Sequence, residues 1–309
     1  MKKYFYLHSD GLLTKAFNNV DKVSVPYKKG IDYAYRKKLS KCRAFGNTIC
    51  SKMDLYVKSI PTLEKMDEFH KGVIEIEIGI EDLRRVLSSV SWASKKIASL
   101  EKTMIKKEGK NFVLSSYFGR IKSIVMEQEK NFQIINMAIS ILTHLPYINP
   151  DNPVIVVIGY PNVGKSMFIG YVSTLQPSIA PYPFTTKKIE MGHFTRNRKT
   201  FQILDTPGII DRVIHNKMEN LSLSAVKTVA KTIIFMIDPT EQCGWPISDQ
   251  ELLLQKIRNA YTASSFIEVE TKSDLLKRSG NEAYNRIKIS SVTGEGIEDL
   301  LKKLDEMYK

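Results

Sequence analysis

Residues 159–166 read Gly-Tyr-Pro-Asn-Val-Gly-Lys-Ser, a GxxxxGKS motif that restricts the fold of this 309-residue chain more than any other feature. The apolar run 154–158 precedes the motif, and the helix-like segment 167–172 follows it. A strand, this glycine-rich loop and a helix, in that order, are typical of a phosphate-binding loop. The sequence therefore predicts an α/β domain that binds a nucleotide.

The residue types of this loop predict the role of each position. Glycines allow backbone N–H groups to face the phosphates, Lys165 neutralises β- and γ-phosphate charge, and the Ser166 hydroxyl is a magnesium ligand. Lys165 is therefore also a catalytic candidate. The candidate nucleotide-binding residues of the loop are Asn162, Val163, Gly164, Lys165, Ser166 and Met167.

The two halves of the chain differ in periodicity. Before residue 150, apolar residues recur every three to four positions, which predicts an antiparallel helical bundle. Its expected helical segments are 12–20, 49–60, 80–104 and 121–142. Pro61 ends the second segment, Gly109 the third and Pro146 the fourth. Three prolines between 146 and 153 mark a boundary, because they cannot continue a helix. We expect a basic N-terminal helical bundle at 1–150 and a P-loop domain at 151–309.

After the boundary, short β-rich runs alternate with helical stretches. This alternation predicts a mostly parallel sheet with helices on both faces. The expected strands are 154–158, 201–204, 233–237, 266–269 and 287–289, with 188–195 as an additional antiparallel strand. The expected helices are 218–230, 249–261 and 297–307.

The formal charge of +13 lies mainly in the first half of the chain. Residues 1–150 contain 26 Lys and Arg against 15 Asp and Glu, a net charge of +11, whereas residues 151–309 contain 20 against 18. The clusters at 36–43, 95–96 and 106–110 could neutralise nucleic-acid phosphates. A solvated surface that maintains solubility is the alternative.

Other parts of the composition exclude several classes of protein. No apolar run reaches the roughly 18 residues of a membrane span, and the N-terminus lacks the apolar core of a secretion signal. The three cysteines lack the spacing of a zinc site or a disulfide framework. We expect a soluble, cytoplasmic protein with no membrane partner.

Asp205-Thr-Pro-Gly208 follows the predicted strand 201–204, at the sheet edge where ligands bind in α/β folds. Asp205 would hold magnesium through water, and the Gly208 N–H would sense the γ-phosphate. An ordinary strand-ending turn is the alternative for this motif. Between the phosphate loop and Asp205 lie Thr185 and Thr186, one of which could join the magnesium shell; we prefer Thr186. Thr186 and Gly208 are thus catalytic candidates.

Thr271-Lys272-Ser273-Asp274 follows the predicted strand 266–269 and indicates which base is bound. The Asp274 carboxylate can accept hydrogen bonds from both N1–H and the exocyclic amine of guanine, whereas adenine offers no such pair of donors. Thr271 stands where asparagine is commoner. Backbone N–H groups of Ser291 and Val292, after the last strand, could bind the guanine oxygen.

The order and separation of these elements resemble a translation-factor-type GTPase domain. The segments 159–166, 182–187, 205–212 and 241–244 further resemble the nucleolar GTP-binding protein 1 family, relatives of the Obg group, and so do 145–150 and Gly119-Arg120 in the bundle. The chain length resembles a compact archaeal version. This resemblance implies GTP or GDP with Mg²⁺ as cofactors, assembly of the large ribosomal subunit as function, and contact between the bundle and ribosomal RNA.

The residue after Gly208 is Ile209, where Ras-like enzymes have a glutamine that orients the attacking water. We therefore expect slow intrinsic hydrolysis. Asn162 resembles the asparagine of potassium-dependent GTPases; a turn-forming asparagine is the alternative. The leading hypothesis is a GTP-controlled ribosome assembly factor that is monomeric off the ribosome. The alternatives are a GTP-dependent protein-interaction switch without RNA contact and a metabolic phosphohydrolase or ATPase.

Overall fold

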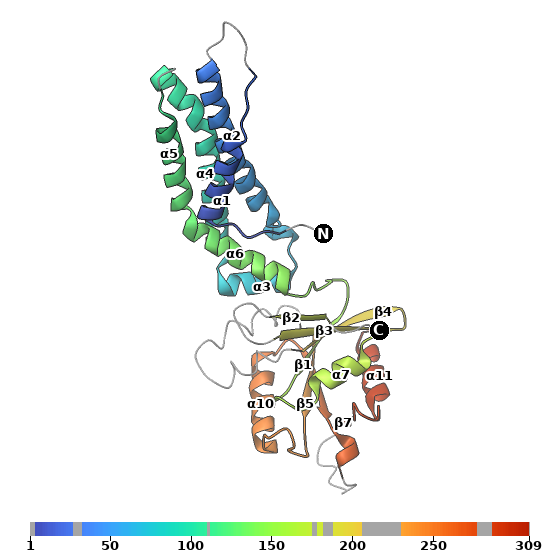
Figure 1. Ribbon diagram of the computed structural model, residues 1–309. Helices are drawn as coiled ribbons and strands as arrows, with labels where there is room; N and C mark the ends of the chain where they lie inside the picture. Colours follow the sequence, from blue (N-terminus) through green and yellow to red (C-terminus); the bar gives the residue numbers. More distant parts are fainter. Residues whose placement is uncertain are drawn as a thin grey trace. The chain divides into compact units, whose positions relative to one another are not determined.

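The computed structural model describes residues 4–26, 33–109, 112–174, 178–181, 188–205, 230–276 and 286–308 (Figure 1). The chain divides into two compact units, each with its own core. The first comprises Met1–Met66 and Glu77–Thr143, and the second comprises Asp67–Ile76 and His144–Lys309.

The first unit is a bundle of long helices, as the apolar periodicity predicted. Arg43 pairs with Glu101 at 3.0 Å, and the Cys50 thiol donates to the Ser94 carbonyl at 3.3 Å, so the helices over 33–59 (α2) and 80–108 (α4) run antiparallel (Figure 1). The helix predicted over 80–104 is confirmed and ends before Gly109. The bundle consists of α1 (Ser9–Asp21), α2 (Tyr33–Ser59), α4 (Ile80–Glu108), α5 (Leu114–Glu127) and α6 (Glu129–His144).

The predicted helix over 121–142 is wrong in one respect, because the structure divides it into α5 and α6 at Gln128. The Gln128 side chain is buried and accepts hydrogen bonds from Ser89 and Asn131. The Glu129 carboxylate accepts the backbone N–H of Ser9 at 2.8 Å. These polar contacts stabilise a turn that the apolar pattern of the sequence does not indicate.

One short helix was not predicted. The helix α3 (Glu68–Glu77) follows the 3₁₀ turn η1 (Leu63–Lys65). Asp67 precedes α3 and accepts the backbone N–H of His70 at 3.0 Å, which satisfies one of the unpaired donors of the first turn.

The second unit contains a seven-stranded sheet in the order β2-β3-β4-β1-β5-β6-β7. The neighbours β4, β1, β5, β6 and β7 are mutually parallel, and β3 is antiparallel to β4, as predicted. The edge strand β2 was not predicted. The strands are β1 (Val154–Ile158), β2 (Ser178–Pro181), β3 (Lys188–Arg196), β4 (Lys199–Asp205), β5 (Thr232–Ile237), β6 (Ser265–Glu270) and β7 (Ile287–Lys288).

The central strand β1 is buried along its whole length, which explains its continuous apolar sequence. The helices that the structure describes in this unit besides α3 are α7 (Lys165–Val172), α10 (Ile247–Ala260) and α11 (Ile297–Met307), together with the 3₁₀ turn η3 (Ser273–Leu275). Most of the helix predicted over 218–230 lies outside the described residues. Among the described helices of both units, none is long and apolar enough to cross a bilayer.

Candidate nucleotide-binding site

The parallel strands bring five loops to one edge of the sheet. Because β4, β1, β5, β6 and β7 run in the same direction, the residues that follow each strand leave at the same carboxyl edge. Ligands bind at this edge in open α/β sheets. The loops contain the phosphate loop after β1, Asp205 at the end of β4, Asp238 after β5, Thr271–Asp274 after β6 and Ser290–Gly294 after β7.

The phosphate loop has the backbone conformation that its glycines and asparagine permit. Gly164 has φ +103° and Asn162 has φ +63°, both in the left-handed region that these residue types tolerate best. A Cβ atom at Gly159 would lie 2.5 Å from the Met236 carbonyl oxygen, so only glycine fits between β1 and β5. The Lys165 Nζ donates to the carbonyls of Gly159 and Tyr160, each at 2.8 Å. The lysine is therefore held within the loop that it would serve.

The two metal candidates that the structure describes lie side by side. The Ser166 hydroxyl donates to Oδ2 of Asp205 at 2.8 Å, and the Asp205 side chain is buried. A hydroxyl and a carboxylate are hard oxygen ligands, the donor set that Mg²⁺ prefers, so these residues fit that ion. Thr186, Thr185, Gly208 and Ile209 lie outside the described residues.

The predicted base-recognition loop is anchored to the sheet by its first residue. Thr271 is buried and donates both its backbone N–H, at 2.8 Å, and its hydroxyl, at 3.1 Å, to the Ile237 carbonyl. Lys272 has φ +57°, and this left-handed residue turns the chain into η3. Asp274 lies in η3 with its side chain exposed. The carboxylate can therefore be reached by a ligand.

The loop after β7 is a serine-centred turn. The buried Ser290 hydroxyl oxygen accepts the backbone N–H groups of Val292 and Thr293, each at 3.2 Å. The backbone N–H of Ser273 donates to the Ile289 carbonyl at 3.1 Å, which fixes η3 beside this loop. The structure thus places Ser291 and Val292 close in space to the loop that carries Asp274.

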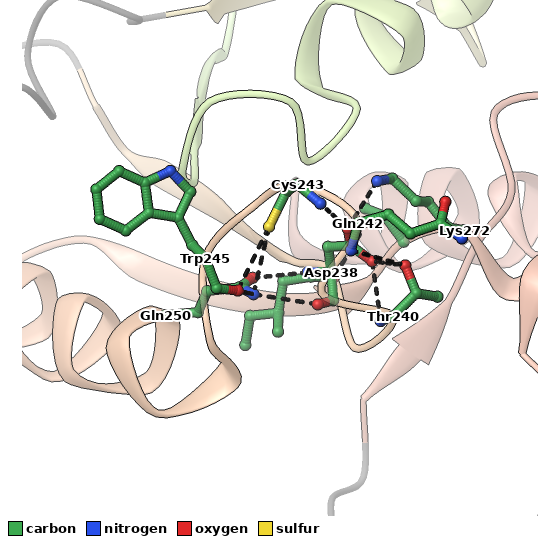
Figure 2. Close-up of polar contacts among 9 residues, drawn as sticks. Asp238, Thr240, Gln242, Cys243, Trp245, Gln250 and Lys272 are labelled. Atoms are coloured by element: carbon green, nitrogen blue, oxygen red, sulfur yellow. Dashed lines mark hydrogen bonds and ion pairs between the residues drawn. The ribbon is translucent and has the colours of Figure 1, made fainter.

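Asp238, for which the sequence predicted no role, lies at the centre of a polar cluster (Figure 2). The Asp238 carboxylate is fully buried and accepts from Lys272 Nζ at 2.6 Å and from the backbone N–H groups of Thr240 and Cys243. Gln250 of α10 accepts the Asp238 backbone N–H at 2.7 Å. Burial raises the pKa of Asp238, but the hydrogen bonds from Lys272, Thr240 and Cys243 outweigh burial and hold this pKa below its ordinary value.

The same cluster reaches the phosphate loop through two aromatic rings. Trp245 stacks on Tyr160 with ring centroids 4.4 Å apart, and Gln250 Nε2 donates to the Trp245 carbonyl at 2.9 Å. Loop 238–246 therefore connects Tyr160 of the phosphate loop with Lys272 of the base-recognition loop. Asp238 could have been found from the sequence by its position directly after a predicted strand of the parallel sheet.

Comparison with protein families matches both parts of the chain. The model for the NOG1 N-terminal helical domain matches residues 7–149, and the model for a 50S ribosome-binding GTPase matches residues 154–272. The second match includes the phosphate loop, Asp205 and Lys272.

Curated relatives and a solved structure are also similar to this chain. An uncharacterized protein of Methanocaldococcus jannaschii, MJ1408, is 28% identical over 87% of this chain and 79% of its own length. Nucleolar GTP-binding protein 1 of Encephalitozoon cuniculi is 29% identical over 79% of this chain and 48% of its own length, so the chain spans about half of this curated relative. A crystal structure of a nucleolar GTP-binding protein 1 from Plasmodium falciparum is 30% identical and covers 52% of this chain and 89% of that chain, with a TM-score of 0.44. The chain belongs to the nucleolar GTP-binding protein 1 family of GTPases.

Proposed function

We propose that this GTPase is an assembly factor for the large ribosomal subunit, whose basic helical bundle docks on ribosomal RNA under the control of GTP. The observation that carries the proposal is the convergence of the phosphate loop, the Ser166–Asp205 pair and the Asp274 loop at one sheet edge. The family matches to a ribosome-binding GTPase and to the helical domain support the ribosomal partner.

In this proposal each described site residue has one task. Lys165 moves its ammonium group from the loop carbonyls to the phosphates, and Asp274 binds the guanine edge. Ser166 directly and Asp205 through water would hold Mg²⁺, which would supply positive charge to offset the β- and γ-phosphates. Thr186 and Gly208 complete the γ-phosphate contacts, as the sequence motif predicts. GDP lacks the γ-phosphate, so only GTP makes the contacts to the loops of Thr186 and Gly208.

Potassium as a second cation is a separate part of the proposal. The sequence motif supports it through Asn162, but the left-handed backbone of this residue, with φ +63°, also gives an asparagine a purely conformational reason to stand there. Hydrolysis rates in K⁺ and in Na⁺, at equal ionic strength, decide between the two explanations. A rate raised by K⁺ supports the ion, and equal rates assign Asn162 to the turn.

The arrangement of the bundle supports RNA as the partner. Because α2 and α4 are antiparallel, the first turns of α2 lie beside the last turns of α4 (Figure 1). Two lysine clusters that are far apart in the sequence therefore meet at one end of the bundle. This basic end consists of Lys37, Lys38 and Lys41 on α2 and of Lys102, Lys106 and Lys107 on α4. Lysines gathered in this way favour binding to the RNA backbone. We place the protein in the cytoplasm, as a monomer when off the ribosome.

Co-sedimentation of the full chain with purified large ribosomal subunits tests the function. We expect more protein in the pellet with a non-hydrolysable GTP analogue than with GDP or without nucleotide. The Lys37→Gln/Lys106→Gln variant should pellet less, whereas the matched Lys302→Gln/Lys303→Gln variant on α11 should behave as the unmodified protein. Failure to pellet with mature and immature subunits in every nucleotide state would contradict the proposal and favour a protein-interaction switch.

A further inference from the structure

The helix α4 carries an exposed tryptophan, although tryptophans in proteins are mostly buried. The Trp92 side chain is 59% exposed, although α4 buries Leu83, Val90 and Ile97 on its opposite face. Tryptophan is the residue with the largest apolar surface, and it is enriched where a protein binds a partner. Because Trp92 lies on the solvent side of a packed helix, its apolar surface is available to a ligand and does not contribute to the core.

The charged residues that follow Trp92 on this helix face are basic. Lys95 and Lys96 lie one turn beyond Trp92, and Lys96 Nζ lies 4.7 Å from the centroid of the indole ring. Further along α4, the exposed side chains include Lys102, Lys106 and Lys107. At a rise of 1.5 Å per residue, residues 92 to 106 extend over about 21 Å. Trp92 therefore lies at the start of a cationic strip that leads to the basic end.

Acidic residues do not neutralise this strip in the part that is described. Glu101 faces α2 and pairs with Arg43 at 3.0 Å. Before Trp92, in contrast, the arginines of α4 are neutralised by acidic partners. Arg84 pairs with Glu81 at 2.7 Å, and Arg85 pairs with Asp82 at 2.8 Å. The uncompensated positive charge of the face thus begins at the tryptophan.

We propose that Trp92, Lys95 and Lys96 form a site for an unpaired RNA nucleotide, with the base stacked on the indole ring and the neighbouring phosphates held by the two lysines. The inference rests on the proposed function and deepens it, because it specifies single-stranded RNA rather than a paired helix. Bases in a duplex are stacked on each other, whereas a loop or bulge can present a base to an aromatic ring. An acidic protein segment would use the lysines but has no base to stack on the indole ring.

The chain has only two tryptophans, which makes the site directly observable. In the full-length Trp245→Phe variant, Trp92 is the only tryptophan. We expect oligoadenylate to quench and saturate its fluorescence, and a fully paired RNA hairpin of equal phosphate number to quench it much less. Trp92→Ala should weaken oligoadenylate binding about tenfold, within the range for one stacked base, whereas Trp92→Phe should retain most of the affinity.

The lysines have their own test and a matched control. Lys95→Gln/Lys96→Gln should lower the slope of log affinity against log salt by about one to two, because two fewer phosphates are neutralised. Lys302→Gln/Lys303→Gln, which removes the same charge from α11, should leave this slope unchanged. Circular dichroism of each variant establishes that the helices are retained.

The outcomes separate this inference from the proposed function. Binding of ribosomal subunits with unchanged Trp92 fluorescence, and with full affinity in Trp92→Ala, would overturn the inference and leave the assembly function intact. Equal quenching by polyglutamate and by oligoadenylate would overturn it in favour of an acidic protein partner. Quenching by oligoadenylate without any binding to ribosomal subunits would support the nucleotide site and contradict the assembly function.

Discussion

Asp238 and Lys272 form an ion pair of 2.6 Å across 34 positions of sequence, with the carboxylate fully buried and the lysine 22% exposed. The pair joins the end of β5 to the loop that carries Asp274. Because a buried charge without its partner is costly, the pair constrains the backbone of both loops. Lys272 thus has a structural task in addition to its place in the base-recognition motif.

Replacing the carboxylate should affect stability and nucleotide binding together. We expect Asp238→Asn to lower the free energy of unfolding by about 2–4 kcal/mol, because the substitution leaves Lys272 without its counter-charge and weakens three accepted hydrogen bonds. GDP affinity should fall as the loop of Asp274 loses its anchor. Urea denaturation and titration with a fluorescent GDP analogue measure the two effects. Asp299→Asn, at an exposed pair, is the control and should change neither quantity.

The same carboxylate predicts a dependence of stability on pH. The pKa of Asp238 is lowered in the folded protein from a reference value of 3.8. A group of this kind contributes stability that is fully present above pH 3.8 and is lost as the pH falls through the lower folded pKa. We expect the difference in unfolding free energy between the unmodified protein and Asp238→Asn to shrink below pH 3.8. A difference that stays constant from pH 6 to pH 3 would contradict the ionised state of Asp238.

The elements predicted from sequence are those with a strong local signal. The helix ended by Gly109 and the strand 154–158 before the phosphate loop have clear apolar periods and clear ends, and both are confirmed. The helix α3 was missed because its last residues, 74–77, alternate apolar and acidic side chains and so resemble a strand. The break at Gln128 depends on contacts with Ser9 and Ser89 from other helices, which no local pattern contains.

In the candidate site, too, some residues were predicted from local motifs and others were not. Motif spacing placed Lys165, Ser166 and Asp205 at a sheet edge, and the structure brings these residues together. The partnership of Asp238 with Lys272 depends on the register of β5 and β6, in which Ile237 is paired with Glu270. Register is a property of the assembled sheet, so the sequence alone could not identify this pair.

A second ion-pair network lies at the edge of the sheet that β6 and β7 form. Arg286 is 4% exposed, and its guanidinium contacts Glu251 at 2.6 Å and Glu268 at 2.7 Å, which connects α10, β6 and the start of β7. We expect Arg286→Met to lower the free energy of unfolding by about 3 kcal/mol, because two carboxylates lose their shared partner. Arg258 also pairs with Glu268 but is 52% exposed, so Arg258→Met should cost about 0–1 kcal/mol. Equal losses in urea denaturation would contradict the role assigned to burial.

The Ser166–Asp205 pair predicts how nucleotide affinity responds to magnesium. We expect Ser166→Ala to weaken GTP binding in Mg²⁺ by about tenfold or more, because one ligand of the ion is removed. Affinity in EDTA should be nearly unchanged, since the backbone of the phosphate loop remains. Titrations of the variant and the unmodified protein in both buffers measure the effect. A loss of the same size in EDTA would show that the serine acts on the loop and not on the ion.

The expected rate of GTP hydrolysis follows from the isoleucine at position 209. An isoleucine cannot orient the attacking water as the glutamine of Ras-like enzymes does, so the purified chain should hydrolyse GTP with a rate constant on the order of 10⁻⁴ s⁻¹ or below. Single-turnover assays with excess protein measure this step without product release, and Lys165→Ala gives the background. Large ribosomal subunits should raise the rate if a partner completes the site. A rate near 1 s⁻¹ for the protein alone would contradict this prediction and place a complete catalytic group within the chain.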